Sequence, residues 1–311
     1  MEKSKVVLTE NKSDLKSRLV QSLSLFGDLD ERGTAPSGVW GSKATIKSGG
    51  VTIKSTELDL EFEIPFDDNL EANEGEIIVY NLSANTRAQL KKGAKIRIEA
   101  GFQNDMGVIF DGYITKVSAA RDKTDLVTSI KIKDDIQEKN TLNLSYGSGT
   151  KASYILRDLV NRTGLTIGWF EIKRDHSYEN SVTVDDTLES ALRQYSEVCG
   201  VSTFVSNGVL YCCNLDNFIE NGSVNFEISE ETGMIGSPQP FTEESEADNG
   251  ETVVYEGYEI EMLLQHRIAA GSVVKVDAEI LTNGNTVCVK SGRHIFNESE
   301  AVTKIKAGRG G

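Results

Sequence analysis

The 3 histidines are the first residues to consider for chemistry, because histidine serves both as a general base and as a metal ligand. His176, His266 and His294 stand far apart, and none has a second histidine or a cysteine at metal-ligand spacing. A zinc site needs several such ligands to converge, and no local pair provides them. No Gly-x-Ser-x-Gly sequence, which exposes a nucleophilic serine, is present either. We therefore expect the histidines at the surface or partly buried, without a catalytic role.

Two other stretches contain the residue types of a ligand site. Residues 147–151, GSGTK, look like a phosphate loop, but they lack the Walker spacing and no apolar parallel strand leads into them. We interpret them as a linker followed by the start of a helix. The acids Asp67, Asp68, Glu71 and Glu74 lack the regular spacing and the fixed glycine of a calcium loop. An exposed acidic loop is the preferred interpretation, so the sequence predicts no metal, no cofactor and no catalytic residue.

Composition restricts the class of protein further. The chain has 311 residues, enough for about two domains, and a formal net charge of −15. A surface of that sign repels phosphate, so specific nucleic-acid binding is not expected. No apolar run approaches the length of about eighteen residues that a membrane span needs. We interpret the four cysteines, Cys199, Cys212, Cys213 and Cys288, as reduced core residues of a protein made in a cytosol.

Alternation of polar and apolar residues predicts a β-rich first domain. The predicted strands are Ala44–Ile46, Val51–Ile53, Glu57–Ile64, Glu76–Leu82, Lys95–Glu99, Val108–Val117 and Asp125–Asp134. A short helix is expected between the fourth and fifth of these strands. Ser83 is its predicted N-cap, because a hydroxyl accepts from free backbone N–H groups, and Gly93 follows its end.

The next segment changes to helical periodicity. Lys151–Thr163 and Asp185–Val198 each carry a wide apolar stripe, and each is followed by a glycine. Asp186 and Glu189 have the spacing of a capping box, which predicts the start of the second helix. Ser206-Asn207-Gly208 predicts the turn of a hairpin within Val201–Cys213. These elements indicate a compact α+β module.

The last third returns to strands. The predicted strands are Tyr258–Leu263, Val273–Val276, Thr286–Val289, Arg293–Phe296 and Ala301–Lys306. Glu243–Glu251 is expected to be an acidic loop, and the final Gly-Arg-Gly-Gly is expected to be a flexible tail.

An internal echo links the first and last thirds. Gly93 is followed by Ile96 and Ile98, and Gly271 is followed by valines at the same offsets. Each pair follows a short connection and an earlier strand. The echo indicates two related β-barrels on either side of the α+β insert.

These patterns together predict the fold class and the domains. We expect a mainly β protein in which two tube-like β-barrel or sandwich domains flank a small two-helix α+β module. The predicted divisions are 1–40, an N-terminal arm and linker with an amphipathic helix at Asp14–Phe26; 41–146, the first β domain; 147–213, the module; and 214–311, the second β domain and tail.

Three passages, in this order, carry a resemblance to a known family. They are EGEIIVYNLSANTRAQLKKGAKIRIEAGF with GVIFDGYITKV; ASYILRDLV, TGLTI and TLESALRQYSEVCGVSTFVSNGVLYC; and MIGSPQ with GYEIEMLLQHRIAAGSVVKV. Across roughly Thr45–Lys306 the chain resembles the baseplate hub proteins of long-tailed bacteriophages and of phage tail-like contractile particles, tail-like bacteriocins among them. Residues 1–40 depart from that pattern.

The resemblance implies a structural role without catalytic residues. Such hubs look like duplicated tube proteins, so a homotrimer would present a ring of six domains that adapts the sixfold tail tube to a threefold tip or spike around the tail lumen. The implied partners are the tail tube protein, the tip or spike protein, other baseplate proteins and the tape-measure protein. The implied location is the tail tip of an assembled virion or tail-like particle, after synthesis in the bacterial cytoplasm. The candidate inter-subunit loop is Phe66, Asp67, Asp68, Asn69, Leu70 and Glu71.

Two other function classes compete with this interpretation. A β-rich cell-surface or carbohydrate-binding module would need an exposed aromatic platform, yet aromatic residues are only 7% and mostly follow strand alternation. A cell-wall hydrolase is the third candidate, because some tail-tip proteins carry lytic domains. The second β domain extends almost to the end of this sequence and leaves no room for one.

Overall fold

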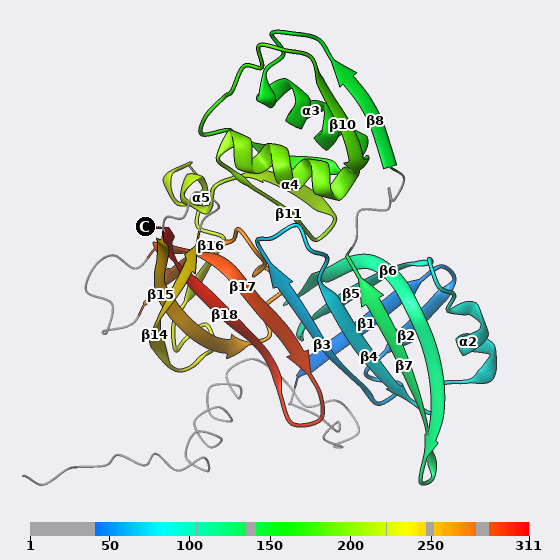
Figure 1. Ribbon diagram of the computed structural model, residues 1–311. Helices are drawn as coiled ribbons and strands as arrows, with labels where there is room; N and C mark the ends of the chain where they lie inside the picture. The colour runs from blue at the N-terminus through cyan, green and yellow to red at the C-terminus, as the bar shows by residue number, and fades with distance from the viewer. Residues whose placement is uncertain are drawn as a thin grey trace, which may run out of the picture. The chain divides into compact units, whose positions relative to one another are not determined.

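The computed structural model of the chain describes residues 41–103, 105–134, 141–221, 223–246, 252–277 and 286–310. The predicted helix Asp14–Phe26 and the arm and linker of residues 1–40 lie outside this range. The described chain is mostly β-strand with short helices (Figure 1), so the predicted fold class is confirmed. Of the two forms that the prediction left open, the sheets are sandwich-like rather than closed barrels.

Strands β1–β7 form what we call the first half of the main sheet, and helix α2 lies between β4 and β5. The elements are β1 Ser42–Ser48, β2 Val51–Lys54, β3 Leu60–Asp67, β4 Glu74–Tyr80, α2 Ala84–Gln89, β5 Lys95–Phe102, β6 Asp105–Asp122 and β7 Asp125–Lys133. Alternate residues of these strands face one core, as period-two patterning requires. Ile46, Phe62, Ile77, Ile96 and Ile130 are all at most 3% exposed.

The predicted start of α2 is confirmed, but its predicted end is not, because Leu90 caps the helix in extended backbone and Gly93 lies three residues beyond it. The Ser83 hydroxyl accepts a hydrogen bond from the backbone N–H of Thr86 at 3.1 Å, which satisfies a free donor of the first turn. Gly93 has φ of +82°, a conformation that costs glycine little. Its N–H donates to the carbonyl of Ile114 in β6, so the turn after the helix is bonded to the sheet.

The α+β module, β8 to β12, and then helix α5 follow. They are β8 Thr141–Tyr146, α3 Ala152–Arg162, β9 Thr166–Phe170, β10 Val182–Thr187, α4 Leu188–Cys199, β11 Ser202–Ser206, β12 Val209–Cys213 and α5 Leu215–Asn221. Helices α3 and α4 bury their apolar stripes in one shared core. The predicted hairpin turn is confirmed, because Asn207 and Gly208 both have positive φ, at 49° and 78°.

The predicted capping box at Asp186 and Glu189 is wrong. Helix α4 is capped by Thr187, whose hydroxyl accepts from the backbone N–H three residues on at 3.2 Å. Asp185 and Asp186 instead belong to strand β10, in which Asp186 pairs with Leu142 of β8. Pairing with a strand distant in sequence extends β10 up to the helix, and a local capping pattern does not contain that information.

Strands β13–β18 form the second half of the main sheet. They are β13 Phe226–Ile228, β14 Met234–Glu246, β15 Thr252–Leu263, β16 Val273–Val276, β17 Thr286–Phe296 and β18 Ala301–Gly310. Their buried residues, such as Ile260, Val274 and Ile305, form a separate core cluster. The two strands predicted within residues 286–296 are one strand, β17, with a register shift between Val289 and Ser291.

Two further expectations for this half are wrong. The predicted acidic loop Glu243–Glu251 begins inside β14, which pairs with β15 as far as Glu246 opposite Thr252. The predicted flexible tail is strand β18, which stays paired with β15 up to Gly310. A Cβ on Gly308 would come within 2.3 Å of the Glu256 carbonyl oxygen, so this glycine serves close strand approach rather than flexibility.

The two halves repeat one strand order. The first half runs β3-β4-β7-β6-β5 and the second runs β14-β15-β18-β17-β16. The predicted echo marks this repeat: the N–H of Gly93 donates to Ile114 O at 2.7 Å, and the N–H of Gly271 donates to Val289 O at 2.9 Å. Both glycines also share φ near +80°, at 82° and 81°. The halves differ beyond this block, because β1 pairs antiparallel with β5 whereas β13 pairs parallel with β16.

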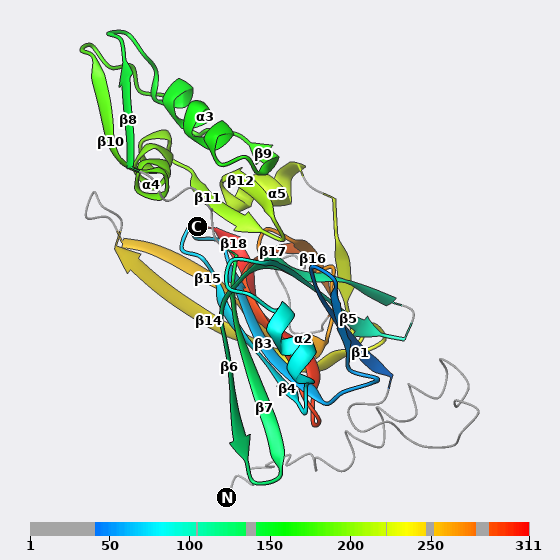
Figure 2. The same cartoon turned by 90° about the vertical axis from the view of Figure 1, so that its right-hand side faces the viewer.

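A single strand pair joins the halves into one sheet. Strand β17 pairs antiparallel with β3 over six residues, from Ser291 opposite Asp67 to Phe296 opposite Phe62. Figure 1 shows β18, β17, β3 and β4 side by side, and Figure 2 shows the same sheet turned by 90°. We call the β17–β3 pairing the internal joint.

All four cysteines are buried, as predicted: Cys199, Cys212, Cys213 and Cys288 are at most 1% exposed. Burial raises the pKa of the Cys199 thiol to about 11 and that of Cys213 to about 12, so both stay protonated at neutral pH. No helix in the described part of the chain is long and apolar enough to cross a bilayer.

Candidate functional site

The internal joint is held by side chains as well as by backbone pairing. The Arg293 guanidinium lies 3.1 Å from a carboxylate oxygen of Glu63. Two ring pairs cross the joint: Phe62 stacks on Phe296 with centroids 5.2 Å apart, and Phe66 meets His294 at 4.9 Å. These contacts make the joint a packed interface between two halves of one chain.

The expectation that His294 lies at the surface or is partly buried is wrong, because its side chain is 1% exposed within this joint and stays neutral. Its Nδ1 lies 2.9 Å from the Thr303 hydroxyl, which also accepts from the backbone N–H of Gln265. Burial lowers the pKa of His294 to about 3. An imidazole with that pKa is a weak base at neutral pH, so its role is packing and hydrogen bonding.

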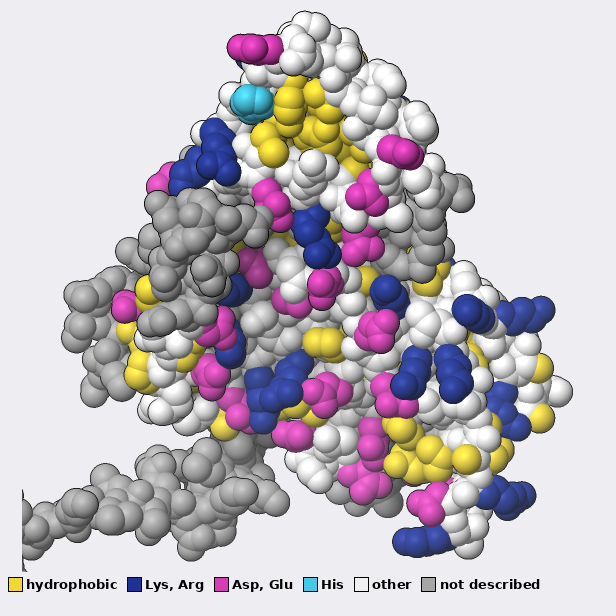
Figure 3. Space-filling model, in the orientation of Figure 1, with side chains coloured by type: hydrophobic (Ala, Val, Ile, Leu, Met, Phe, Trp, Pro, Cys, Tyr) yellow, Lys and Arg dark blue, Asp and Glu magenta, His cyan; other side chains and the backbone are white. Residues whose placement is uncertain are grey.

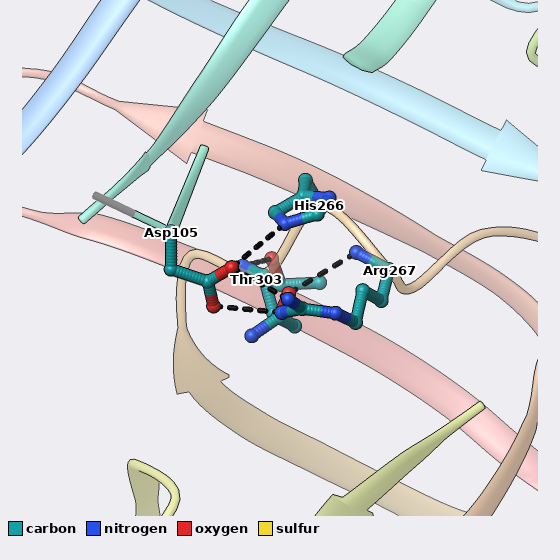
Figure 4. Close-up of polar contacts among 5 residues, drawn as sticks. Asp105, His266, Arg267 and Thr303 are labelled. Atoms are coloured by element: carbon teal, nitrogen blue, oxygen red, sulfur yellow. Dashed lines mark hydrogen bonds and ion pairs between the residues drawn. The ribbon is translucent and has the colours of Figure 1, made fainter. Parts of the chain in front are cut away.

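Three residues form a second contact between the halves, which we call the Asp105 clamp. The Asp105 carboxylate accepts from two guanidinium nitrogens of Arg267, each at 2.7 Å, and lies 3.0 Å from His266 Nε2 (Figure 4). Arg267, more than any other neighbour, holds the pKa of Asp105 well below its usual range. Asp105 begins β6, and its two partners lie between β15 and β16. The clamp therefore connects turns more than 160 residues apart.

Gly107 lets the clamp close. A Cβ at this position would come within 2.1 Å of the His266 ring. Only glycine leaves space for the imidazole to lie against β6 and reach Asp105. The clamp thus depends on the backbone of the first half and on two side chains of the second half.

We expect Asp105→Asn to lower the free energy of unfolding by about 1 kcal/mol. Both ends of the Asp105–Arg267 pair are more than 40% exposed, so solvent screening keeps the effect small although the geometry is bidentate. Urea denaturation at low and high salt measures the effect, which should shrink as salt rises. Asp122→Asn, exposed at the far end of the same strand, is the matched control. An equal loss in both variants would contradict a specific contribution from the clamp.

The structure separates the six residues of the predicted inter-subunit loop. Phe66 and Asp67 belong to β3 and pair across the internal joint. Leu70 packs against the core of the α+β module, and Glu71 lies 3.6 Å from Arg193 of α4. Asn69 is exposed, and Asp68 is half-buried. Much of this loop contacts its own chain, and its contact with a neighbouring subunit remains a prediction.

Burial explains the raised pKa values of two carboxyl groups in this region. Loss of solvent raises the pKa of Asp68 to about 6 and that of Asp134, bonded to Asn73, to about 7. Within the described residues no group of three or more His, Cys, Asp or Glu side chains is placed to hold a metal ion. A cavity beside Phe66 and His294 has room for about one water molecule.

Charged side chains on the polar face of the sheet form cross-strand pairs. Lys304 lies 3.4 Å from Glu261, and Glu76 stands opposite Lys131 in the β4–β7 register. Figure 3 shows basic and acidic side chains interspersed over the face that carries β17, β18 and β3. Alternating signs give no concentrated basic patch, so this face lacks the charge pattern of a nucleic-acid site.

Sequence reasoning missed the clamp and the internal joint. Asp105 is the first residue of β6, and Arg267 lies in the connection between β15 and β16. Opposite charges so far apart in sequence cannot be paired from one sequence. The glycine echo indicated that the two halves are related, but it did not identify Asp105 or Arg267.

Solved structures with this fold come from phage tails and a related secretion system. The 43 kDa tail protein of prophage MuSo2 from Shewanella oneidensis aligns with a TM-score of 0.59 at 10% identity, over 86% of this chain and 98% of that one. The tail protein from Neisseria meningitidis MC58 aligns at 0.60 and 10%, over 87% and 97%. The E. coli c3393 protein, a type VI secretion component, aligns at 0.57 and 12%, over 85% and 76%. The fold is therefore that of phage tail proteins.

A family model narrows this class. The model described as baseplate hub gp41 matches residues 43–286, which is most of the 311-residue chain. The chain therefore belongs to the baseplate hub gp41 family, and its role is that of a structural component of a phage tail or tail-like particle. None of the curated proteins matches the sequence.

Proposed function

We propose that three copies of this chain close into a ring at the tail hub, around the tail lumen. The observation that carries the proposal is the repeated strand order β3-β4-β7-β6-β5 and β14-β15-β18-β17-β16 within one chain. Three copies of a chain with two similar half-sheets present six similar units to the tube and three whole chains to the tip. Such a ring adapts a sixfold tail tube to a threefold tip or spike.

The proposed partners are those of a hub: a second and third copy, the tail tube protein, the tip or spike protein, other baseplate proteins and the tape-measure protein. We further propose that the chain works without catalysis. The strongly shifted groups have structural causes, since Arg267 accounts for the pKa of Asp105 and burial accounts for that of His294. The loop at Phe66–Glu71 stays a candidate for contact with a neighbouring subunit through its exposed residues Asn69 and Glu71.

The domain division is also a proposal: 1–40 arm, 41–146 first β domain, 147–213 module and 214–311 second β domain. Strand pairing favours one change to it. β8, Thr141–Tyr146, pairs with β10, and its Leu142, Leu144 and Tyr146 pack against the module core. We therefore place the boundary between the first β domain and the module after Asp134, which is hydrogen-bonded to Asn73, so that β8 belongs to the module.

The mass of the purified full-length chain tests the ring. We expect native mass spectrometry to find a trimer of the 34.0 kDa chain, alone or once the neighbouring tube and tip proteins are added. The reason is that a repeated sheet with unpaired end strands gains backbone hydrogen bonds by closing. A chain that stays monomeric at high concentration and in the presence of both neighbours would contradict the proposal.

A further inference from the structure

The repeat contains a second pair of strands equivalent to the internal joint, and these two strands, which we call the open pair, are not paired with each other in the chain. In the repeated order, β17 of the second half corresponds to β6 of the first, and β3 of the first half corresponds to β14 of the second. The pair that joins the halves, β17–β3, therefore corresponds to a pair between β6 and β14. These two strands do not pair within the chain.

The correspondence can be fixed to single residues. Strand β17 shifts register against β18 between Val289 and Ser291, and β6 shifts against β7 between Ile114 and Lys116. Val289 and Ile114 also accept the matching glycine hydrogen bonds. Ser291 therefore corresponds to Lys116, and the rest of each strand follows in step.

The same reasoning aligns the other side of the joint. Glu63 of β3 pairs with Glu76, which stands opposite Lys131 of β7. Gln239 of β14 pairs with Glu259, which stands opposite Lys306 of β18. Lys131 pairs with Lys116, and Lys306 pairs with Ser291, the two residues that were matched above. Glu63 therefore corresponds to Gln239. Asp67 then corresponds to Glu243, four residues further along each strand.

Both strands of the open pair have an unpaired edge in the described chain. Beyond Ile114, β6 pairs only with β7, and the residues from Ser118 to Asp122 are exposed. Strand β14 is a terminal strand of the sheet, and β15 is its one partner among the described strands. Unpaired edges of this length are sites for strand addition.

We propose that β6 of one copy pairs antiparallel with β14 of a second copy, in the register of the internal joint. Residues 116–120 of one chain then face residues 239–243 of the other. The proposed pairs are Lys116 with Glu243, Val117 with Thr242, Ser118 with Phe241, Ala119 with Pro240 and Ala120 with Gln239. The occupant of each edge is thus another copy of this chain.

Side-chain sizes and charges fit this pairing. In the internal joint a glycine, Gly292, lies under the large ring of Phe66. At the corresponding position of the open pair, a larger residue, Val117, faces a smaller one, Thr242. Lys116 faces Glu243, whose carboxylate already contacts Lys290 and Lys306 of its own chain and has lone pairs to accept from a third cation.

Prolines limit what else can pair with this edge. Pro238 and Pro240 remove two N–H donors from β14, a feature that keeps edge strands from pairing indiscriminately. Any strand added to this edge therefore forms fewer backbone hydrogen bonds, so matching side chains must supply part of the stability. The edge is therefore selective for its own partner.

The contact is head-to-tail, because each copy contributes one β6 edge and one β14 edge. Head-to-tail contacts close into rings when the rotation permits. The number of copies in that ring rests on the proposed function, whereas the identity of the two strands rests on the repeat alone.

Disulfide trapping tests the register in the full-length chain. Ala120→Cys with Gln239→Cys places two exposed residues in the proposed register, where Cα separations suit a disulfide. Ala119→Cys with Gln239→Cys is the matched control, since a shift of one residue turns the side chains to opposite faces. Mild oxidation should convert most of the in-register variant into covalent trimers on a non-reducing gel, and the control should remain at least tenfold less cross-linked.

The outcomes separate this inference from the proposed function. A wild-type trimer by mass with no in-register cross-link, or with equal cross-linking of both variants, would overturn the β6–β14 joint and leave the ring standing. Covalent dimers alone would support the joint and contradict the threefold ring. Because oxidation also traps transient encounters, a chain that stays monomeric and never cross-links, even with the tube and tip proteins present, would overturn both.

Discussion

Gly292→Val should destabilise the protein by roughly 3 kcal/mol and open the internal joint. A Cβ at Gly292 would come within 2.4 Å of the Lys304 carbonyl oxygen and 2.6 Å of the Phe66 ring. The carbonyl belongs to β18, which is paired on both sides, so the backbone cannot move away without breaking other pairs. Urea denaturation followed by circular dichroism gives the change in the free energy of unfolding.

A valine elsewhere provides the control. Gly147 has no atom within 4 Å of its ideal Cβ position, so Gly147→Val changes the same residue type without a clash. We expect this control to stay within about 0.5 kcal/mol of the wild type. A loss of less than about 1 kcal/mol for Gly292→Val would mean that the joint yields easily, contrary to its packing.

Local patterns predicted the parts of the fold that local physics determines. Alternation found β4, β5 and β7, because each buries one face against a single core and leaves the other in solvent. Capping and turn chemistry placed Ser83 and the turn at Asn207-Gly208 correctly. These features depend on residues within a few positions of each other, so one sequence contains the information.

Elements whose extent depends on distant pairing were predicted poorly. The segment from Glu243 to Glu246 was predicted to begin a loop, yet β15 supplies the hydrogen bonds that make it part of strand β14. The C-terminal glycines read as flexible, yet they allow β18 to approach β15 closely. Composition describes what a segment prefers alone, and tertiary pairing overrides that preference.

The candidate site shows the same division. The loop at Phe66–Glu71 was found from its acids and its place between strands, and it does lie at an end of the internal joint. The Asp105 clamp and His294 were not found, because their partners come from the other half of the chain. The glycine echo at Gly93 and Gly271 was the exception, since a repeat places long-range information in a short pattern.

Asp134→Asn should stabilise the protein at pH 8 and have little effect near pH 4. Burial raises the pKa of the Asp134 carboxyl from an ordinary 3.8 to about 7, so the folded state holds its proton more tightly than the unfolded state does. The contribution of the protonated group is fully present below pH 3.8 and is lost as pH rises through about 7. Asparagine stays neutral at every pH and avoids that loss.

The expected gain at pH 8 is about 2 to 4 kcal/mol, the upper figure being the whole shift converted at 1.36 kcal/mol per unit. The Asp134 carboxylate accepts from the backbone N–H of Asn73 at 2.6 Å, and the amide oxygen of asparagine can keep this hydrogen bond. The second contact, from the Asn73 side-chain amide at 3.1 Å, survives if that amide turns over to present its oxygen. Loss of one charge-assisted bond is the reason for the lower figure.

To test this prediction, the free energy of unfolding of wild type and variant is measured from pH 4 to pH 8, and the difference between them is compared across this range. His294 gives a slope of the opposite sign, because its lowered pKa removes stability as pH falls below 6.5. Asp68, with its pKa raised to about 6, acts in the same direction as Asp134. Both groups are present in wild type and variant alike, so their contributions cancel in the difference. A difference that stays flat across this range would show that Asp134 is already ionised in the folded protein and that the Asn73 contacts, rather than burial, dominate its pKa.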